Sequence, residues 1–549
     1  MREGEEYGII CDMRNANAIR VPTTGVFDFE RLITDGEAKY VDKTDLLYEL
    51  AKPKTDSQLF ISRPRRFGKS LMLSTLKAMF EGRRDLFKGL AIDKLPWEGW
   101  TQPTPVYSFT MGDVSGETYE EVKEQLSDLV ACLCDEAGVP FPAKGSVVGR
   151  FGAFIKAAAA KSPTKRIVVL IDEYDEPVAK FLADIKTLNK VRSVLHDFYE
   201  KLKFNSGSIR FLLMTGVTKL TKLSIFSGLN HLTDLSMDPR FATLLGYTHE
   251  ELDGPLRENV EAFGDKNGLD FAAAKGEILR WYDGYRFSPK NEARVCNPVS
   301  IGNAFKTGDI KCFWEMTGRA TLVINRVEKA GKKPEDLENV PADAFMLDVC
   351  DAETLPMTSL LYQGGYLTIK DVICGNPLRD ETDKYVLAPP NLEVREALKR
   401  GYLSQVMGLA ESNCDTIFDR AKRLIADGDI REVVETMLFS LYAAVPPDWR
   451  IRDEAEAKRY FQLFFSMLGA NPAPEFPSAR GYADAIVERP NLVYVFEFKY
   501  DETSEAAIRQ IRDRGYADKW IGGKRPVTLI GINFNPKKRN IDIPVIEPA

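Results

Sequence analysis

The chain has 549 residues, of which 44% are hydrophobic and 28% are charged, with 74 Lys and Arg residues against 81 Asp and Glu residues. At about 150 residues per domain, this length predicts several folding units, and the composition excludes a collagen-like, wholly disordered or membrane-spanning chain. The net charge of −7 excludes a uniformly basic coat for nucleic acid, but it is compatible with a local basic groove.

The N-terminus and the cysteines show no sign of export or of a zinc site. The acidic start of the chain is not followed by an apolar stretch of signal-peptide length. No apolar run approaches the roughly 20 residues that a membrane-spanning helix needs. The eight Cys residues include no Cys-x-x-Cys pair, and the three His residues have no partner at metal-site spacing. We therefore expect a cytoplasmic protein with reduced thiols and no membrane partner.

Strands and helices are predicted to alternate along the first part of the chain. The predicted strands are 57–62, 106–109, 166–171 and 210–214, and the predicted helices follow residue 70 and cover 122–136 and 185–203. Such alternation is typical of a doubly wound α/β domain. The run 166–171 is continuously apolar and rich in β-branched residues, as in parallel strands that are buried on both faces.

The later parts of the chain predict shorter helices, a helical connector and a second α/β domain. We expect a hairpin at 365–372 and largely helical structure over 391–442, with a domain boundary at Pro446-Pro447. The predicted elements after it are a helix at 452–468, a turn at 471–477, strands at 482–488 and 492–500, a helix at 505–514 and a strand at 526–532. The predicted division is an N-terminal extension 1–20, a core 21–245, a lid with a small mixed module 246–375, a connector 376–449 and a last domain 450–549.

A phosphate-binding loop is predicted directly after the first strand. The segment Arg63–Ser70 fits the pattern GxxxxGK[ST] except at the first glycine, which is Arg63. Gly68 would let the backbone approach a phosphate, Lys69 would reach the β- and γ-oxygens, and Ser70 would ligate Mg²⁺. The candidate nucleotide-binding residues are Arg65, Arg66, Phe67, Gly68, Lys69, Ser70 and Leu71. The alternative is a basic surface turn before an amphipathic helix.

Two carboxylates end the apolar strand 166–171, at the sheet edge where parallel strands bind ligands. Asp172 would hold Mg²⁺, and Glu173 would polarise the water that attacks the γ-phosphate. Thr215 ends the next strand, where it would sense the γ-phosphate. The alternatives are ordinary strands that end in polar turns.

These motifs together resemble the bacterial AAA-ATPase-like family, over roughly residues 20–300. The matching segments are Asp42-Lys43-Thr44, Arg63–Leu71, Leu170–Asp175, Gly216–Lys219 and Phe226–Asn230. The resemblance implies a P-loop, AAA-like ATPase core on a parallel sheet with a helical lid, to which a nuclease-like domain is commonly attached. It makes Arg63 a family feature and Arg286 a candidate second sensor, with a buried structural arginine as the alternative for Arg286.

A second candidate site combines Asp484 on one predicted strand with Glu497 and Lys499 on the next. Because side chains alternate along a strand, Glu497 and Lys499 share one face and Phe496 and Phe498 share the other. Asp484 and Glu497 would bind Mg²⁺ or Mn²⁺, which prefer oxygen ligands, and Lys499 would stabilise charge on a reacting phosphate. The alternative is a half-exposed strand with a salt-bridged Glu and Lys.

This arrangement resembles the PD-(D/E)xK nuclease superfamily, over about residues 450–535. The resemblance implies an α/β restriction-endonuclease-like domain in which Asp484, Glu497 and Lys499 are catalytic. It adds Glu475, Gln510 and Tyr516 as candidates. The family's first helix usually supplies an acid; Glu454 and Glu456 are candidates for it, but Lys458 stands near the expected position.

Two hypotheses for function follow. In the first, ATP controls a Mg²⁺-dependent nuclease that hydrolyses DNA or RNA, with a role in bacterial defence or mobile-element biology implied by the resemblance. In the second, the protein is a non-nucleolytic nucleotide switch or scaffold whose last domain binds nucleic acid or a protein. The oligomeric state is open, with a homo-oligomer among the alternatives.

Two clusters of basic residues accompany the candidate sites. Arg63, Arg65, Arg66 and Lys69 are expected to form the phosphate cradle. The second cluster, which predicts a confined basic groove or else a solvated helix face, consists of Arg509, Arg512, Arg514, Lys519, Lys524 and Arg525.

Overall fold

The computed structural model divides the chain into two compact units, unit 1 (Met1–Trp314 with Leu337–Glu393) and unit 2 (Glu315–Asp336 with Val394–Ala549). The residues that it describes are 19–52, 57–181, 184–219, 232–314, 324, 327, 330, 332, 334–348, 357–375, 382–407, 420–421, 423–425, 429–444, 451–467, 473–478, 481–489 and 491–549. The predicted motif Phe226–Asn230 and the predicted boundary at Pro446-Pro447 lie outside the described residues. The finer division into five segments stays a prediction.

Unit 1 is built on a parallel sheet with the strand order β2-β3-β4-β1-β5, which confirms the predicted fold class. The strands are β1 (Gln58–Ser62), β2 (Val106–Thr110), β3 (Ile167–Asp172), β4 (Ile209–Gly216) and β5 (Thr233–Asp234). Because β4 lies between β1 and β3, the ends of three strands that are far apart in the sequence meet at one sheet edge.

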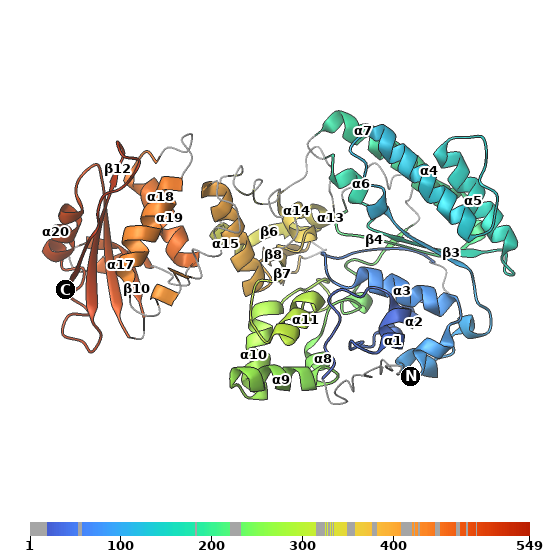
Figure 1. Ribbon diagram of the computed structural model, residues 1–549, viewed down its shortest axis with the longest axis horizontal. Helices are drawn as coiled ribbons and strands as arrows, with labels where there is room; N and C mark the ends of the chain where they lie inside the picture. Colours follow the sequence, from blue (N-terminus) through green and yellow to red (C-terminus); the bar gives the residue numbers. More distant parts are fainter. Residues whose placement is uncertain are drawn as a thin grey trace, which may run out of the picture. The chain divides into compact units, whose positions relative to one another are not determined.

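Helices cover both faces of this sheet. The helices of this part are α1 (Phe29–Asp35), α2 (Thr44–Ala51), α3 (Lys69–Phe80), α4 (Tyr119–Glu136), α5 (Val147–Lys161), α6 (Glu176–Ala179) and α7 (Ile185–Phe204). Figure 1 shows α4, α5 and α7 together on one face and α3 on the other. On the first face, Leu126, Phe151 and Leu195 belong to the same core cluster as Ile171. On the second face, the ring of Phe80 of α3 packs against the ring of Phe211. The alanine-rich helix α5 was not among the predicted elements.

A helical part and a small antiparallel sheet complete unit 1. The elements are α8 (His249–Asp253), α9 (Arg257–Asn267), α10 (Phe271–Tyr282), α11 (Pro298–Thr307), β6 (Val340–Asp343), α13 (Ala344–Asp348), α14 (Met357–Gln363), β7 (Thr368–Ile373) and β8 (Lys384–Ala388). The hairpin predicted at 365–372 is wrong: β7 is one strand, and it pairs with β8 in the order β6-β8-β7. Local alternation within 365–372 could not reveal that the pairing partner is the next strand, which begins at Lys384.

Short 3-10 segments lie between the larger elements of unit 1. They are Arg84–Phe87, Ala91–Lys94, Glu98–Trp100, Met111–Asp113, Ser206–Ser208 and Pro239–Phe241, and a further 3-10 segment, Pro334–Leu337, lies mostly among the residues of unit 2.

Unit 2 contains a mixed sheet with helices on both faces. Its strands are β9 (Ala473–Ser478), β10 (Gly481–Glu488), β11 (Val493–Tyr500), β12 (Val527–Asn535), β13 (Asn540–Ile541) and β14 (Val545–Pro548). The order is β13-β12-β11-β10-β9, with β14 beside β12; β10 and β11 are antiparallel, whereas β11 and β12 are parallel. The turn predicted at 471–477 is wrong, because β9 pairs there with β10 and its two prolines stand on an edge strand.

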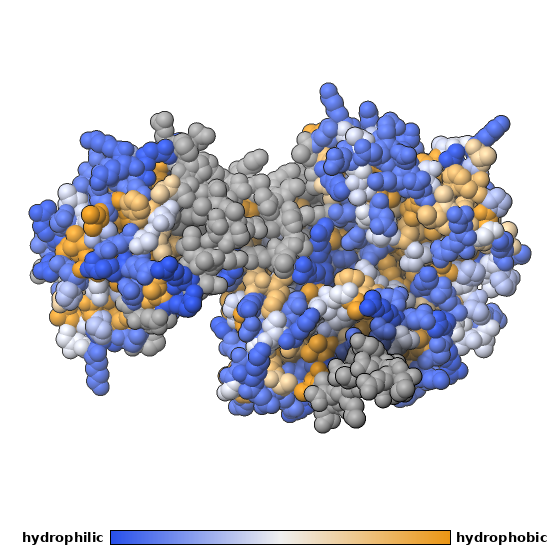
Figure 2. Space-filling view, in the orientation of Figure 1, coloured by the Kyte–Doolittle hydropathy of each residue, from blue (hydrophilic) through white to orange (hydrophobic). Residues whose placement is uncertain are grey.

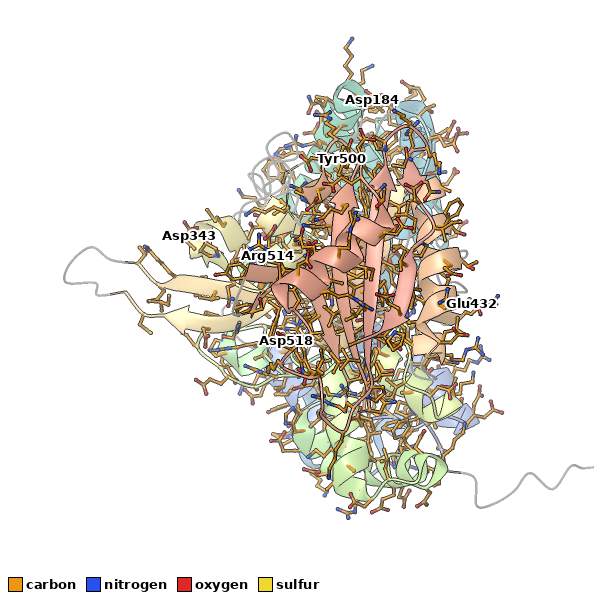
Figure 3. The ribbon with its side chains drawn as sticks, turned by 90° about the vertical axis from the view of Figure 1, so that its left-hand side faces the viewer. Asp184, Asp343, Glu432, Tyr500, Arg514 and Asp518 are labelled. Atoms are coloured by element: carbon orange, nitrogen blue, oxygen red, sulfur yellow. The ribbon has the colours of Figure 1, made fainter. Side chains whose placement is uncertain are left out.

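Helices α19 (Glu454–Met467) and α20 (Ser504–Arg514) pack on opposite faces of this sheet. The other helices of unit 2 are α15 (Leu392–Met407), which begins in unit 1, α17 (Ile430–Glu432), a π-helical segment (Val433–Leu438) and α18 (Phe439–Ala444). Phe461 of α19 packs on Phe496 and Phe498, and Ile508 of α20 belongs to the core cluster that includes Val495. Figure 3 shows α20 in front of the sheet, with Arg514 at its end and Tyr500 at the end of β11.

Hydrophilic residues cover much of the surface seen in Figure 2, with hydrophobic residues scattered between them. None of the helices in the described part of the chain is long and apolar enough to cross a membrane.

Candidate functional site

The polar ends of three neighbouring strands meet around Asp172 in unit 1. Ser70, at the start of α3, donates a hydrogen bond from Oγ to Asp172 Oδ2 at 2.5 Å. Thr215, at the end of β4, lies with Oγ1 at 3.4 Å from Asp172 Oδ1. The structure therefore brings together three residues that the sequence predicted for one magnesium and nucleotide site.

Lys69 is buried at the centre of the predicted phosphate loop. Its ammonium donates to the carbonyl oxygens of Arg63 at 3.0 Å and Pro64 at 2.9 Å. Burial lowers the pKa of Lys69, and the negative charge of Asp172 partly offsets this effect. Among the described residues, no carboxylate forms an ion pair with this ammonium, so a buried positive charge is available for an anion.

The backbone of the loop is held in a conformation that requires glycine at one position. Gly68 caps α3 with φ 87°, in the left-handed region that residues with a Cβ rarely adopt. A Cβ built on Gly68 would meet nothing within 4 Å, so the requirement is conformational rather than steric. The helix that follows directs its first amide groups toward the loop, an arrangement that favours a bound phosphate.

Glu173 follows Asp172 with a left-handed backbone, φ 50°, that turns its side chain toward β2. Its carboxylate accepts a hydrogen bond from Thr110 Oγ1 at 3.4 Å. Burial and the neighbouring charge of Asp172 raise the pKa of Glu173. A Cβ on Gly112 would lie 2.4 Å from Glu173 Oε2, so glycine at that position gives the carboxylate room. A raised pKa is the property that a general base or a water-orienting group needs.

The side chains of the other loop residues contact protein groups. Arg65 pairs with Glu176 at 3.2 Å, and Arg66 donates to the carbonyl oxygen of Phe313 at 3.1 Å. Phe67 is buried edge-on against Tyr285. In this conformation these three residues offer a phosphate their backbone amides rather than their side chains.

Arg63 lies outside the expected phosphate cradle. Its guanidinium is buried and donates to the carbonyl oxygens of Ser62 (2.9 Å), Ser236 (2.8 Å) and Phe241 (3.1 Å). The ring of Phe287 lies 4.1 Å from its central carbon. Burial lowers the pKa of Arg63 to about 10. The residue that replaces the first glycine of the P-loop pattern therefore joins β1 to the segment after β5.

Replacing Arg63 by alanine is expected to destabilise unit 1 by about 2–4 kcal/mol, because three carbonyl oxygens lose their donor and a cavity remains under Phe287. A thermal melt of the purified protein measures the effect. Arg31→Ala, on the exposed surface of α1, is the matched control and should change stability by less than about 0.5 kcal/mol. Equal melting temperatures for the Arg63 variant and the wild type would contradict the structural role.

The guanidinium of Arg286, the candidate second sensor, donates hydrogen bonds to a turn of its own segment. They reach the carbonyl oxygens of Ser288, Asn291 and Pro289 at 3.0, 3.0 and 2.8 Å. This geometry favours the alternative of a buried structural arginine.

An apolar pocket beside the loop was not recognised in the sequence. It is lined by Gly68 and Leu71, by Lys39–Val41, by Leu244–Tyr247 and by Pro298, among other residues. Its walls come from segments far apart in the chain, so no local sequence pattern could indicate this pocket. Its position next to Lys69 and its apolar lining suit a flat organic group attached to a phosphate chain.

Asp175 is a further buried residue of the site that the sequence left without a role. It accepts hydrogen bonds from the amide and hydroxyl of Thr218 at 2.9 and 2.5 Å, and from the amide of Val217 at 3.3 Å. Glycine at 216 is required, since a Cβ there would lie 2.5 Å from Asp175 Oδ1. Asp175 thus joins the strand end that carries Asp172 to the segment that follows Thr215.

In unit 2, Asp484 lies where β10 and β11 separate. The pairing of β10 with β11 ends on this side at Ala485 and Phe496. Beyond it, Asp484 Oδ2 accepts a hydrogen bond from the amide of Phe498 at 2.7 Å. The Asp484 carboxylate thereby accepts a hydrogen bond from a backbone amide of β11, in the place of a backbone carbonyl of β10. It therefore lies between the two strands, rather than strictly on the face that alternation predicts. The structure nevertheless brings Asp484 next to Glu497, as the sequence analysis expected.

Glu497 is almost fully buried, with 2% of its surface exposed. Its Oε1 accepts hydrogen bonds from Lys499 Nζ, at 3.3 Å, and from Gln510 Nε2. Its Oε2 is buried and has no hydrogen-bond partner. Burial, helped by the charge of Asp484, raises the pKa of Glu497 to about 7. An unpartnered buried carboxylate oxygen is costly unless a cation binds it, so the residues present fit a divalent metal ion.

Gln510 and Tyr516, predicted as accessory residues, lie at the same place. Gln510 on α20 contacts both Glu497 and the hydroxyl of Tyr516, the latter at 3.4 Å. Glu475 lies on β9 between Pro474 and Phe476, which pair with Ala485 and Ala483, so its backbone stands opposite Asp484. The side chain of Glu475 is outside the described residues.

The raised pKa of Glu497 predicts a pH-dependent stability of the metal-free protein. Between about pH 5 and 7 the folded chain holds a proton on Glu497 that the unfolded chain has lost, so stability falls as the pH rises through this range. The fall should be on the order of 2 kcal/mol and should be reduced in Glu497→Gln. Thermal unfolding in a chelator at pH 5, 6, 7 and 8 measures it; parallel curves for the two proteins would contradict the prediction.

Lys458, rather than an acid, faces Asp484 from α19. Its ammonium lies 2.5 Å from Asp484 Oδ1 and 2.5 Å from Glu454 Oε1. The sequence has Lys458 near the position where the nuclease pattern has an acid, and this lysine therefore lies in the site itself. Glu456 accepts a hydrogen bond from the amide of Arg452 and caps the start of α19 instead.

Part of the predicted basic cluster is paired with acids. Arg512 lies 2.7 Å from Glu547, and Arg525 lies 2.5 Å from Glu488. Lys519 lies over the rings of Phe476 and Trp520. Arg509, Arg514 and Lys524 are exposed. The cluster is thus partly a salt-bridged surface and partly an exposed basic surface.

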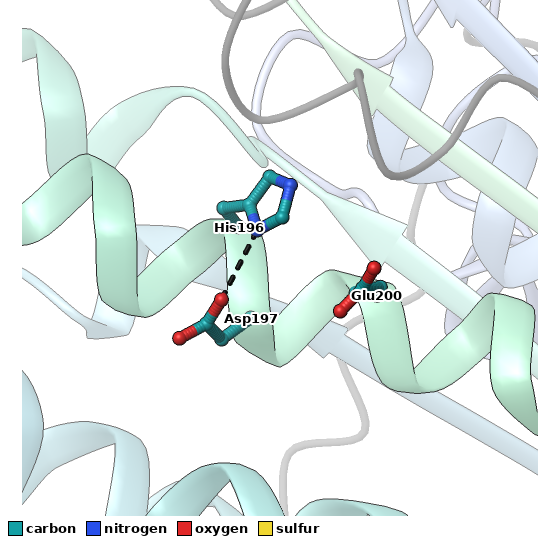
Figure 4. Close-up of side chains that lie close together, drawn as sticks. All are labelled: His196, Asp197 and Glu200. Carbon is teal, nitrogen blue, oxygen red and sulfur yellow. Dashed lines mark hydrogen bonds and ion pairs between the residues drawn. The ribbon is translucent and has the colours of Figure 1, made fainter.

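One group of metal-ligand type lies apart from both sites. His196, Asp197 and Glu200 on α7 have ligand atoms within 4.8 Å of one another (Figure 4). The expectation that no His has a partner at metal-site spacing was wrong. His196 and Glu200 share a helix face, and the partners of the histidine are carboxylates. Asp197 is exposed, and the ring of His196 already contacts it at 3.1 Å.

Comparisons with known proteins agree with this geometry. A family model described as a predicted AAA-ATPase matches residues 23–226, and one described as the PD-(D/E)XK nuclease superfamily matches residues 452–543. The chain is 31% identical over 530 residues to an uncharacterized protein in the vnfD 5'region of Azotobacter chroococcum mcd 1, covering 94% of this chain and 97% of that relative. No solved structure matches the chain.

Proposed function

Since the chain belongs to the family of this Azotobacter protein and joins a predicted AAA-ATPase domain to a PD-(D/E)XK nuclease superfamily domain, we propose that it is a nucleotide-controlled, metal-dependent nuclease. ATP bound in unit 1 would regulate hydrolysis of phosphodiester bonds in unit 2. The observation that carries the proposal is the buried, unpartnered Oε2 of Glu497 beside Asp484 and Lys499.

The arrangement in unit 1 supports the nucleotide part of the proposal. Lys69 would leave the carbonyl oxygens of its own loop and donate to the β- and γ-phosphates. Ser70 and Asp172, which already share a hydrogen bond, would hold Mg²⁺. Glu173 would orient the attacking water, and Thr215 would contact the γ-phosphate. The apolar pocket lined by Leu71 would take the base.

The arrangement in unit 2 supports the nuclease part. Asp484 and Glu497 would hold a divalent ion such as Mg²⁺ or Mn²⁺, which supplies Lewis-acid activation of the phosphate and of a water. Lys499 would donate to the phosphate oxygens on which charge develops. Its ammonium is held in place by a hydrogen bond to the carbonyl oxygen of Phe498, at 3.0 Å. Gln510 and Tyr516 would keep Glu497 in place. The exposed Arg509, Arg514 and Lys524 would contribute to binding the nucleic-acid backbone.

The direct test is a cleavage assay on the full chain. Purified protein is incubated with single- and double-stranded DNA and RNA, with Mg²⁺ or Mn²⁺, and with ATP, ADP or no nucleotide. We expect metal-dependent cleavage of at least one substrate, at a rate that changes with the nucleotide. Cleavage that is equal in all nucleotide states would contradict the control by unit 1.

A second candidate function is a nucleotide switch whose last domain binds nucleic acid or a protein without cutting. The observation that favours it is the ion pair of Lys458 with Asp484, which occupies a carboxylate oxygen that a metal would use. Absence of cleavage under every condition, together with nucleotide-dependent retention of one nucleic acid in a filter-binding assay, would select this alternative.

A further inference from the structure

The ammonium of Lys458 is a fixed positive charge inside the proposed nuclease centre. Lys458 projects from α19, and its Nζ lies 2.5 Å from both Asp484 Oδ1 and Glu454 Oε1. The side chain is 23% exposed, and that of Asp484 is 13% exposed. The contact is therefore a short, mostly desolvated ion pair, unlike the loose pairs of a solvated helix face.

The oxygens of the two carboxylates are unequally engaged. Asp484 Oδ1 accepts from Lys458, and Asp484 Oδ2 accepts from the amide of Phe498. Glu497 Oε1 accepts from Lys499 and from Gln510. Glu497 Oε2 alone of the four is buried without a hydrogen-bond partner. One cation position is therefore open at this pair of carboxylates, and one is already filled by a protein cation.

We propose that the nuclease centre holds a single divalent ion, seated on Glu497 Oε2 and Asp484, and that the ammonium of Lys458 stands in the place of a second ion. The inference rests on the proposed metal-dependent nuclease function and specifies how its centre is built. Lys458 acts as a positioning residue: it orients Asp484 and supplies a positive charge that needs no metal to bind.

The physical reason is the spacing of charges. Two-ion centres hold their ions about 3.5–4 Å apart with a carboxylate shared between them. A second ion on Asp484 Oδ1 would lie at contact distance from the Lys458 ammonium, which is held from its other side by Glu454. Repulsion between a dication and an ammonium at that separation costs several kcal/mol even at a surface-like dielectric of about 20. A second ion could bind only after Lys458 had left both carboxylates.

The test counts metal ions on the full chain without nucleotide. Mn²⁺ is titrated into wild type and into Glu497→Gln, and bound ions are counted by electron paramagnetic resonance. The difference between the two counts is the number of ions at the nuclease centre. Weak sites elsewhere, such as the cluster on α7, are present in both proteins and do not affect this difference. We expect one site to be lost.

Each outcome decides a different statement. Loss of two sites would overturn the single-ion inference and leave the nuclease proposal standing. Loss of no site would contradict a metal ion on Glu497, and with it both the inference and the proposed nuclease function. Loss of one site supports both.

A pair of substitutions at Lys458 adds an independent check. Lys458→Glu replaces the cation by a ligand, so the count at the centre should rise from one to two. Lys458→Met removes the charge without adding a ligand and should leave the count at one. A thermal melt confirms that each variant is folded; if either is not, the wild-type count still decides the question. A folded Lys458→Glu protein that still binds one ion would show that Lys458 does not occupy a second cation position.

Discussion

Replacing Lys69 by alanine is expected to weaken ATP binding by about a hundredfold, which corresponds to about 2.7 kcal/mol. The ammonium of Lys69 is buried and donates hydrogen bonds to the carbonyl oxygens of Arg63 and Pro64. A phosphate chain would replace these neutral acceptors with charged ones, and charge-assisted hydrogen bonds of this kind contribute most to phosphate affinity. Isothermal titration calorimetry with ATP and Mg²⁺ measures the loss.

The matched control for this variant is Lys77→Ala. Lys77 lies on the same helix, α3, but its side chain is only partly buried and faces Glu81 and Glu136 at 4.0 and 3.8 Å. Its removal should leave ATP affinity within about twofold, since surface pairs of this type contribute little. A Lys69→Ala protein that binds ATP as tightly as wild type would show that the predicted loop is not a phosphate site.

Replacing Glu497 by glutamine is expected to lower the rate of nucleic-acid cleavage by at least about a thousandfold, or about 4 kcal/mol of activation free energy. The substitution keeps the shape of the side chain and its contact with Gln510, but it removes the charge that would bind the metal. ATP binding in unit 1 should be unchanged, because the predicted nucleotide residues all lie in the other unit. A fluorescent cleavage assay with saturating Mg²⁺ measures the rate.

Glu488→Gln is the matched control for the nuclease variant. Glu488 lies on β10, at the opposite end of that strand from Asp484, and pairs with Arg525 on the surface. Its substitution should change cleavage by less than about twofold. Equal cleavage by wild type and Glu497→Gln would contradict the assignment of the centre, and a loss of ATP binding in Glu497→Gln would point to general misfolding instead.

Much of the two sites could be predicted from local patterns. Side-chain alternation places Glu497 and Lys499 together, and the loop pattern around Gly68 and Lys69 specifies a helix start that the structure confirms at Lys69. The strand run that ends at Asp172 was recognisable because continuous β-branched residues are typical of a strand buried on both faces. Such signals depend only on neighbours in the chain.

Other features depended on pairings and contacts that the local patterns do not specify, and they were missed or mistaken. The partner of β7 is β8 and not a strand within 365–372, and β9 occupies a stretch whose prolines indicated a turn. His196 and Glu200 come together because they share a helix face, although the spacing pattern for zinc did not include them. In each case the contact that determines the structure joins residues that a fixed sequence motif does not relate to one another.

By itself, the sequence determined which elements carry the two proposed sites, because the residue types and their spacing along single elements already indicate a phosphate-loop pattern, an acidic strand end and an alternating Glu-x-Lys strand. Only the tertiary structure decided how these groups are used. It buried Arg63 under Phe287 instead of placing it at the phosphate cradle, it placed Lys458 on Asp484, and it left Glu497 Oε2 without a partner. The physical reason is that charge pairing and desolvation depend on which distant side chains meet, and packing alone decides that.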